Sequence, residues 1–127
     1  MPENATPKYP MKFEPAADIA RELKRLTRKL NLTHLNPKRI IAFRSFGSKS
    51  RARARIWAFP KIWQMALKLP AYYCIEVLSE KFDHLSANQR RQVLVHELLH
   101  IPKNFSGAVL PHTRRWHKQL REILNAL

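Results

Sequence analysis

One short segment, QVLVHELLHIP at residues 92–102, contains side chains whose types and spacing could perform chemistry. His96 and His100 are four residues apart, and Glu97 directly follows the first histidine. On a helix this spacing places both imidazoles on one face, where their nitrogens can bind the same metal ion. A glutamate beside the first ligand can reach a metal-bound water and act as its general base. The HExxH pattern therefore predicts a zinc site with Glu97 as the base.

The surrounding residues indicate that this segment is a buried helix. SANQ at residues 86–89 has the pattern of a capping box, so the helix is expected to begin near residue 87. Pro102 disfavours continuing the helix through Ile101. Between these limits the helix is apolar almost all round, except for the wedge that holds the histidines and Glu97. A buried carboxylate needs a compensating charge, which a divalent cation would supply.

A third ligand is expected nearer the end of the chain, because a catalytic zinc usually has three protein ligands and one position for water. The segment PHTRRWHKQLREILNAL at residues 111–127 offers His112, His117 and Glu122. If a helix begins at about residue 113, Glu122 points away from the apolar face, which disfavours it as a ligand. His112 and His117 flank the apolar face on either side, and spacing alone leaves both open.

The elements that must position these residues indicate an α+β domain with a small three-stranded sheet. The predicted strands are residues 39–46, 51–59 and 71–79, which are rich in β-branched and aromatic residues or alternate with a period of two. Residues 16–32 have the spacing of an amphipathic helix, and residues 61–69 suggest a short helix. The first fifteen residues contain four prolines and are predicted to form an extended arm, with residues 16–127 forming the domain.

Composition limits the classes of protein. A length of 127 residues fits one domain, and 45% hydrophobic residues argue against disorder. Cys74 is alone and cannot form an internal disulfide, which favours a reducing compartment. Neither a signal peptide nor a membrane-spanning apolar run is recognisable. We therefore expect a cytoplasmic protein without a membrane partner.

The charge is strongly positive, with 24 Lys and Arg residues against 9 Asp and Glu residues, which gives a net charge of +15. Such an excess attracts polyanions, and nucleic acid is the obvious candidate. Arg51, Arg53 and Arg55 alternate along one predicted strand and are the residues that we expect to make this contact. A solvated basic surface is the alternative interpretation.

HELLHIP, followed by FSG and then PH, resembles the small family of phage and archaeal zinc metallopeptidases. The resemblance extends from Gly47 through Trp57 to these motifs. The ending HTRRW is also similar to the His-x-x-x-Trp of SprT-like proteases, whose histidine is the third zinc ligand. Thr113 stands where those sequences often have a glycine.

The resemblance implies a minimal zincin fold with one Zn²⁺ per chain. It implies that His96, His100 and His112 are the ligands and that Glu97 is the base. The activity would be hydrolysis of peptide bonds in a protein or peptide substrate by a zinc-activated water. Zincins hold their substrate along an edge strand, for which we predict residues 71–79. His117 is left as an alternative ligand or as a stabiliser of the oxyanion.

Two other functions compete with this interpretation. In the first, the zinc is structural, His117 is a fourth ligand and Glu97 has no catalytic role. In the second, the protein is a nucleic-acid-binding module that uses its basic surface. Proteolysis and nucleic-acid binding would be combined in a DNA-associated protease of the SprT-like kind. Gly107 is expected to permit the backbone angles that return the chain to the metal.

Overall fold

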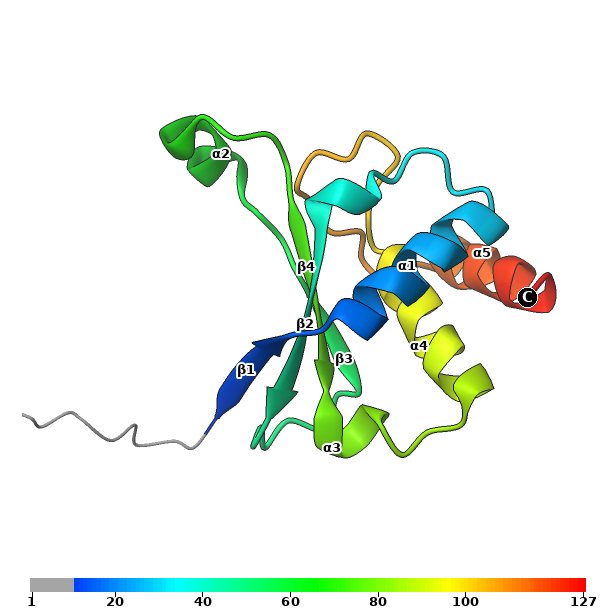
Figure 1. The fold of residues 1–127 in the computed structure, drawn as a ribbon. Helices are drawn as coiled ribbons and strands as arrows, with labels where there is room; N and C mark the ends of the chain where they lie inside the picture. The colour runs from blue at the N-terminus through cyan, green and yellow to red at the C-terminus, as the bar shows by residue number, and fades with distance from the viewer. Residues whose placement is uncertain (1–10) are drawn as a thin grey trace, which may run out of the picture.

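The computed structural model describes residues 11–127, which form one four-stranded mixed sheet with helices α1, α4 and α5 on one side (Figure 1). The strands are β1 (Lys12–Pro15), β2 (Ile40–Phe46), β3 (Ala54–Trp57) and β4 (Tyr73–Leu78). Their order is β1-β2-β4-β3, in which β2 and β4 are parallel and the other pairs are antiparallel. The predicted α+β class is confirmed.

The sheet has four strands instead of the predicted three, because part of the segment predicted as an arm is a strand. Lys12–Pro15 pairs with β2 in the register that places Lys12 opposite Phe46. Pro15 lies at the end of this edge strand, where its missing N–H costs no hydrogen bond within the sheet. The prolines therefore concealed the strand from sequence reasoning. Residues 1–10 of the predicted arm lie outside the described residues.

β4 is a central strand, so the prediction that residues 71–79 form the substrate-binding edge is wrong. β4 pairs with β2 on one side and with β3 on the other. Both sets of its backbone groups are therefore occupied, and it cannot accept another strand. The edges of the sheet are β1 and β3.

The helices are α1 (Ala17–Lys29), α2 (Lys61–Leu67), α3 (Ser79–Phe82), α4 (Ala87–Leu98) and α5 (Arg114–Asn125), with a 3₁₀ turn η1 at Pro37–Arg39. Among residues 11–127, none is both long enough and apolar enough to cross a bilayer.

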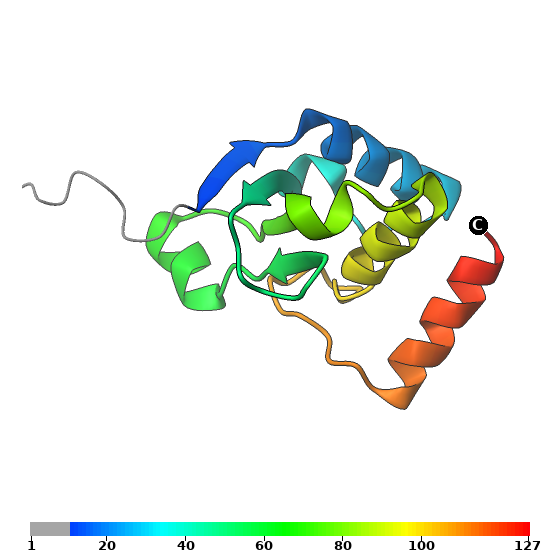
Figure 2. The same ribbon diagram turned by 90° about the horizontal axis from the view of Figure 1, so that it is seen from below.

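The core lies between the sheet and helices α1 and α4, which run side by side in both views (Figures 1 and 2). Ile75 and Val77 of β4 are fully buried, as are Leu26 of α1 and Leu98 of α4. Complete burial of such a side chain contributes about 1.5–3 kcal/mol. The second half of α4, which carries His96 and Glu97, is therefore fixed by packing of its buried side chains.

The beginning of α4 is fixed by its capping box, as predicted. The Ser86 hydroxyl accepts a hydrogen bond from the Gln89 N–H at 3.2 Å, and the Gln89 side-chain oxygen accepts one from the Ser86 N–H at 3.0 Å. α4 also packs against edge strand β3. The HExxH helix is therefore held directly beside an open strand edge.

Candidate metal centre

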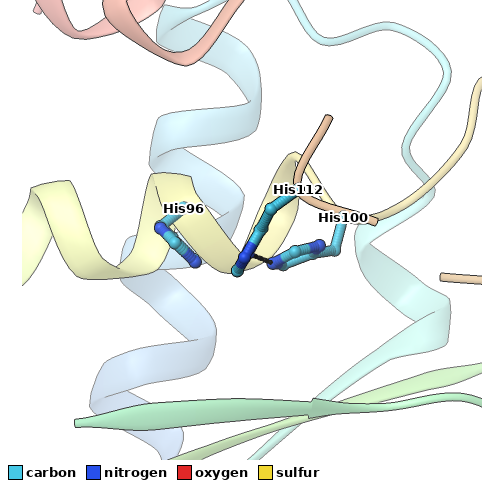
Figure 3. A group of neighbouring side chains, drawn as sticks. All are labelled: His96, His100 and His112. Carbon is cyan, nitrogen blue, oxygen red and sulfur yellow. Dashed lines mark hydrogen bonds between the residues drawn. The ribbon is translucent and has the colours of Figure 1, made fainter. Parts of the chain in front are cut away.

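Three histidine side chains gather at the C-terminal end of α4 (Figure 3). His96 projects from the last turn of α4, His100 from the turn that follows the helix's last residue, Leu98, and His112 reaches them from the segment that precedes α5 (Figure 3). One ring nitrogen of each lies within 4.8 Å of the others, and the Nε2 atoms of His100 and His112 are 2.9 Å apart. Nitrogen ligands of a tetrahedral zinc stand roughly 3.3 Å apart, given Zn–N bonds of about 2.0–2.1 Å. The three histidines could therefore hold a metal ion, and imidazole nitrogens are ligands that zinc accepts.

Leu110, two residues before the third histidine, orients the His100 ring. Its Nδ1–H donates to the Leu110 carbonyl at 2.6 Å, and the Leu110 N–H donates to the His100 carbonyl at 2.7 Å. Since Nδ1 carries the proton, Nε2 keeps its lone pair for a metal. Leu110 is only two residues before His112, so the same pair of bonds positions both ligands.

Tyr73 anchors the chain between the second and third histidines. Its hydroxyl accepts a hydrogen bond from the Gly107 N–H at 2.8 Å and donates one to the Ala108 carbonyl at 2.7 Å. Tyr73 is 1% exposed, so these bonds are largely shielded from water. The sequence gives no local signal for this anchoring role, because both partners lie more than thirty residues away in the chain.

Gln64 of α2 is a second anchor for this segment. Its amide nitrogen donates to the Phe59 carbonyl at 2.7 Å and to the Ser106 carbonyl at 2.9 Å. Gly107 lies against this amide with a φ of 95°, and a Cβ at that position would overlap both Gln64 and the Phe59 carbonyl. The glycine is therefore required by backbone angle, as expected, and also by the close approach of Gln64.

Trp116 forms the wall behind the three imidazoles. It is 3% exposed and stacks on His100, with ring centroids 4.8 Å apart and planes at 21°. Its centroid is also 4.8 Å from that of His96 and 4.5 Å from that of His112. Its indole N–H donates to the Leu99 carbonyl at 2.9 Å. The spacing of four residues from His112 was the sequence signal for this role.

Thr113, which stands where SprT-like sequences often have a glycine, is the N-cap residue of α5. Its hydroxyl accepts a hydrogen bond from the Trp116 N–H at 3.1 Å and so caps the start of α5. A threonine cap contributes about 1 kcal/mol relative to alanine. Thr113 therefore fixes α5, and with it Trp116, immediately after His112.

The Glu97 carboxylate lies beside the histidines and is buried. It is 7% exposed, and its Oε2 atom is 3.9 Å from Nε2 of His96. Within residues 11–127, no lysine or arginine side chain pairs with it. Burial raises the pKa of Glu97 to about 7. A group with this environment is suited to accept and return a proton near neutral pH.

Burial keeps His96 and His100 neutral at neutral pH. It lowers the pKa of His96 to about 4, with a further contribution from the neighbouring His100, His112 and His117. Burial also lowers the pKa of His100, although its bond to Leu110 opposes the shift. Neutral imidazole is the form that binds a metal ion.

His117 does not belong to the group of converging nitrogens. It is exposed on α5, and its ring centroid is 5.6 Å from that of His112. The structure therefore brings His112 together with His96 and His100 and leaves His117 at the border of the site.

The three arginines predicted to contact nucleic acid do not form one basic face. Only Arg55 lies in β3, and its guanidinium donates two hydrogen bonds to Glu76, at 3.2 and 3.0 Å. Arg51 and Arg53 precede the strand and are exposed. Arg55 therefore neutralises a buried carboxylate.

The chain matches the model of one protein family over residues 11–123, and that family is described as "Putative phage metallopeptidase". The matched residues include all four strands and the three converging histidines. No curated protein and no solved structure matches the chain.

Proposed function

Because the chain belongs to the family described as putative phage metallopeptidase, we propose that it hydrolyses peptide bonds with one zinc ion bound by His96, His100 and His112. Membership of this family implies a metal ion and a protein or peptide substrate. The observation that carries the proposal is the convergence of three ring nitrogens beside a buried carboxylate that pairs with no lysine or arginine among residues 11–127.

Each residue of the site has a distinct part in this proposal. When bound, the zinc ion would act as a Lewis acid that lowers the pKa of water and polarises a carbonyl group. Glu97 takes the proton of the attacking water and returns it to the leaving amine. Trp116 excludes water from one side of the imidazoles, and Leu110 keeps His100 in the required tautomer.

A catalytic zinc fits these residues better than a structural one. A closed structural site needs four protein ligands, and His117 is exposed outside the converging group. Glu97 would also have no use in a closed site, although its burial costs free energy. His117 is placed near enough to His112 for a lesser role, which is to donate a hydrogen bond to the oxyanion.

The substrate would lie along β3. Within the part of the chain that the structure describes, this strand is an edge of the sheet, pairs only with β4 and packs against α4. An extended peptide can add to such an edge through backbone hydrogen bonds. β3 thus takes the role that the sequence had suggested for residues 71–79.

Nucleic-acid binding forms no part of the proposal. The net charge of +15 favours contact with polyanions in general. Of the three arginines predicted to make that contact, however, Arg55 is engaged by Glu76. A DNA-associated protease thus has only the overall charge in its favour.

The test is cleavage of an unfolded, fluorescently labelled protein by the purified chain. Chelation should abolish cleavage, and addition of one equivalent of zinc should restore it. Glu97→Gln should bind zinc but lose activity by about 10²–10⁴-fold, which is the usual contribution of a general base. Glu122→Gln, an exposed glutamate on α5, is the matched control and should retain activity. Full activity of Glu97→Gln would reject the proposal.

A further inference from the structure

Exposed apolar side chains are concentrated in two segments, one that includes α2 and one in the loop before His112. Of the ten large apolar side chains exposed among residues 11–127, eight lie within residues 57–69 or at residues 109–110. We call these eight the apolar rim: Trp57, Ile62, Trp63, Met65, Leu67, Leu69, Val109 and Leu110. Clusters of exposed large apolar residues usually mark a binding surface.

The polarity of α2 is reversed relative to an ordinary surface helix. Its one buried residue is the polar Gln64, whereas Ile62 is 67% exposed, Met65 is 64% exposed and Trp63 is 55% exposed. A surface helix normally turns its apolar face to the core. In Figure 1, α2 projects from the sheet at the end of the molecule that also contains the loop before His112.

The conformation of α2 is well defined in spite of this exposure. Pro60 precedes the helix, and Lys68 ends it in the left-handed conformation with a φ of 55°. The Leu69 N–H then donates to the Gln64 carbonyl at 3.0 Å. The helix is thus a built element that presents apolar side chains to solvent.

The apolar rim is continuous with the proposed substrate edge. Trp57 is the last residue of β3, and α2 begins four residues later. Gln64 bonds the carbonyl of Ser106, in the loop that supplies Val109, Leu110 and then His112. A peptide that lies along β3 and extends past Trp57 would therefore meet α2.

The length of α2 suits a few substrate side chains. Seven helical residues extend about 10 Å. An extended peptide covers that distance with about three residues.

We propose that the apolar rim is the specificity-determining surface of this peptidase and binds bulky apolar side chains of extended polypeptides. The substrate class would be segments rich in leucine, isoleucine and aromatic residues, which are accessible in unfolded proteins. This proposal rests on the proposed function, because it assumes that substrate lies along β3.

The test measures binding without hydrolysis, in zinc-loaded Glu97→Gln protein. Two fluorescent ten-residue peptides of equal charge are compared by anisotropy, one with leucine and phenylalanine and one with serine and threonine in their place. The apolar peptide should bind at least about tenfold more tightly. Adding Ile62→Ser and Trp63→Ser should remove that preference, and Met65→Ser with Leu67→Ser should weaken it independently.

Phe13→Ser is the matched control, because Phe13 is 53% exposed and lies on β1 at the opposite edge of the sheet. It should leave binding unchanged. The proposal is overturned if both rim variants, folded by circular dichroism, keep the parent's preference. It is also overturned if the rim variants keep the preference for the apolar peptide and lose instead only binding to anionic vesicles or only self-association. Absence of hydrolysis would reject the proposed function but would leave this binding result interpretable.

Discussion

Glu76 of β4 and Glu97 of α4 are both buried, at 1% and 7% exposure, but their surroundings are opposite. Glu76 accepts two hydrogen bonds from Arg55 and one, at 2.9 Å, from the Trp57 indole N–H. Burial would raise the pKa of Glu76, yet these bonds outweigh it and lower the pKa. Glu97 has no lysine or arginine partner among the described residues, and burial raises its pKa to about 7.

The difference separates a carboxylate that stabilises the fold from one that serves a site. An ion pair inside a protein offsets the cost of burial only when the carboxylate is well hydrogen-bonded, as Glu76 is. A buried carboxylate left without such a partner is a candidate functional group, particularly beside metal-binding residues. Substitutions at the two positions should therefore affect different properties.

The largest effect is expected for activity when Glu97 becomes glutamine. Glu97→Gln should lower kcat/KM by about 10²–10⁴-fold while the temperature of thermal unfolding does not fall, because no protein partner is lost. Glu76→Gln should lower the unfolding temperature and have the smaller effect on kcat/KM. If activity and stability decreased together in both variants, the assignment of Glu76 to stability and Glu97 to activity would be wrong.

The next effect concerns the partner of Glu76. Arg55→Met leaves the Glu76 carboxylate buried without its ion pair and should reduce the free energy of unfolding by about 2–3 kcal/mol. This lies below the range for fully buried pairs because the Arg55 side chain is 32% exposed. Denaturant titration measures the change. Arg53→Met, an exposed neighbour, is the control, and equal destabilisation by both substitutions would contradict the ion-pair account.

A smaller effect is expected where the sheet supports the metal centre. Tyr73→Phe removes the hydroxyl that bonds Gly107 and Ala108, so His112 would be held less firmly. Zinc affinity should fall by roughly tenfold, as is usual when groups supporting a metal ligand are lost. Competition with a chromophoric chelator gives the affinity, and Tyr72→Phe is the control. An unchanged affinity would show that this loop is positioned without Tyr73.

The smallest effect is the pH dependence of the stability that Glu76 contributes. Because the folded state lowers the pKa of Glu76 below its ordinary 4.5, its contribution to stability is present above that pH. The contribution is lost as the pH falls through the lowered pKa. The stability difference between the wild type and Glu76→Gln should therefore be constant near pH 7 and decrease below about pH 4.5. A difference that grew on acidification would mean that the sign of the pKa shift is wrong.

Much of the fold could be predicted from local patterns. Periodicity and capping residues predict strands β2, β3 and β4, the capping box at Ser86 and the buried character of α4. The order of the strands could not be predicted, because pairing joins segments distant in the chain. For that reason β4 was mistaken for an edge, and β1 was concealed by nearby prolines.

The candidate site shows the same limit. The spacing of His96 and His100 sufficed to predict their convergence, since the last turn of α4 and the turn directly after it position both. His112 and His117 could be separated only by resemblance to known families, because the path of the loop before α5 depends on Tyr73 and Gln64. Their hydrogen-bond partners are 34 to 42 residues away, and local patterns carry no information at that distance.

The most direct test of the central claim is the zinc content of the purified protein and of two histidine variants, by elemental mass spectrometry after removal of loosely bound ions. We predict about one zinc per chain in the wild type and in His117→Ala, and a large loss in His112→Ala. A wild type that binds no zinc when zinc is supplied at neutral pH would contradict the account. So would a His112→Ala variant that retains as much zinc as the wild type.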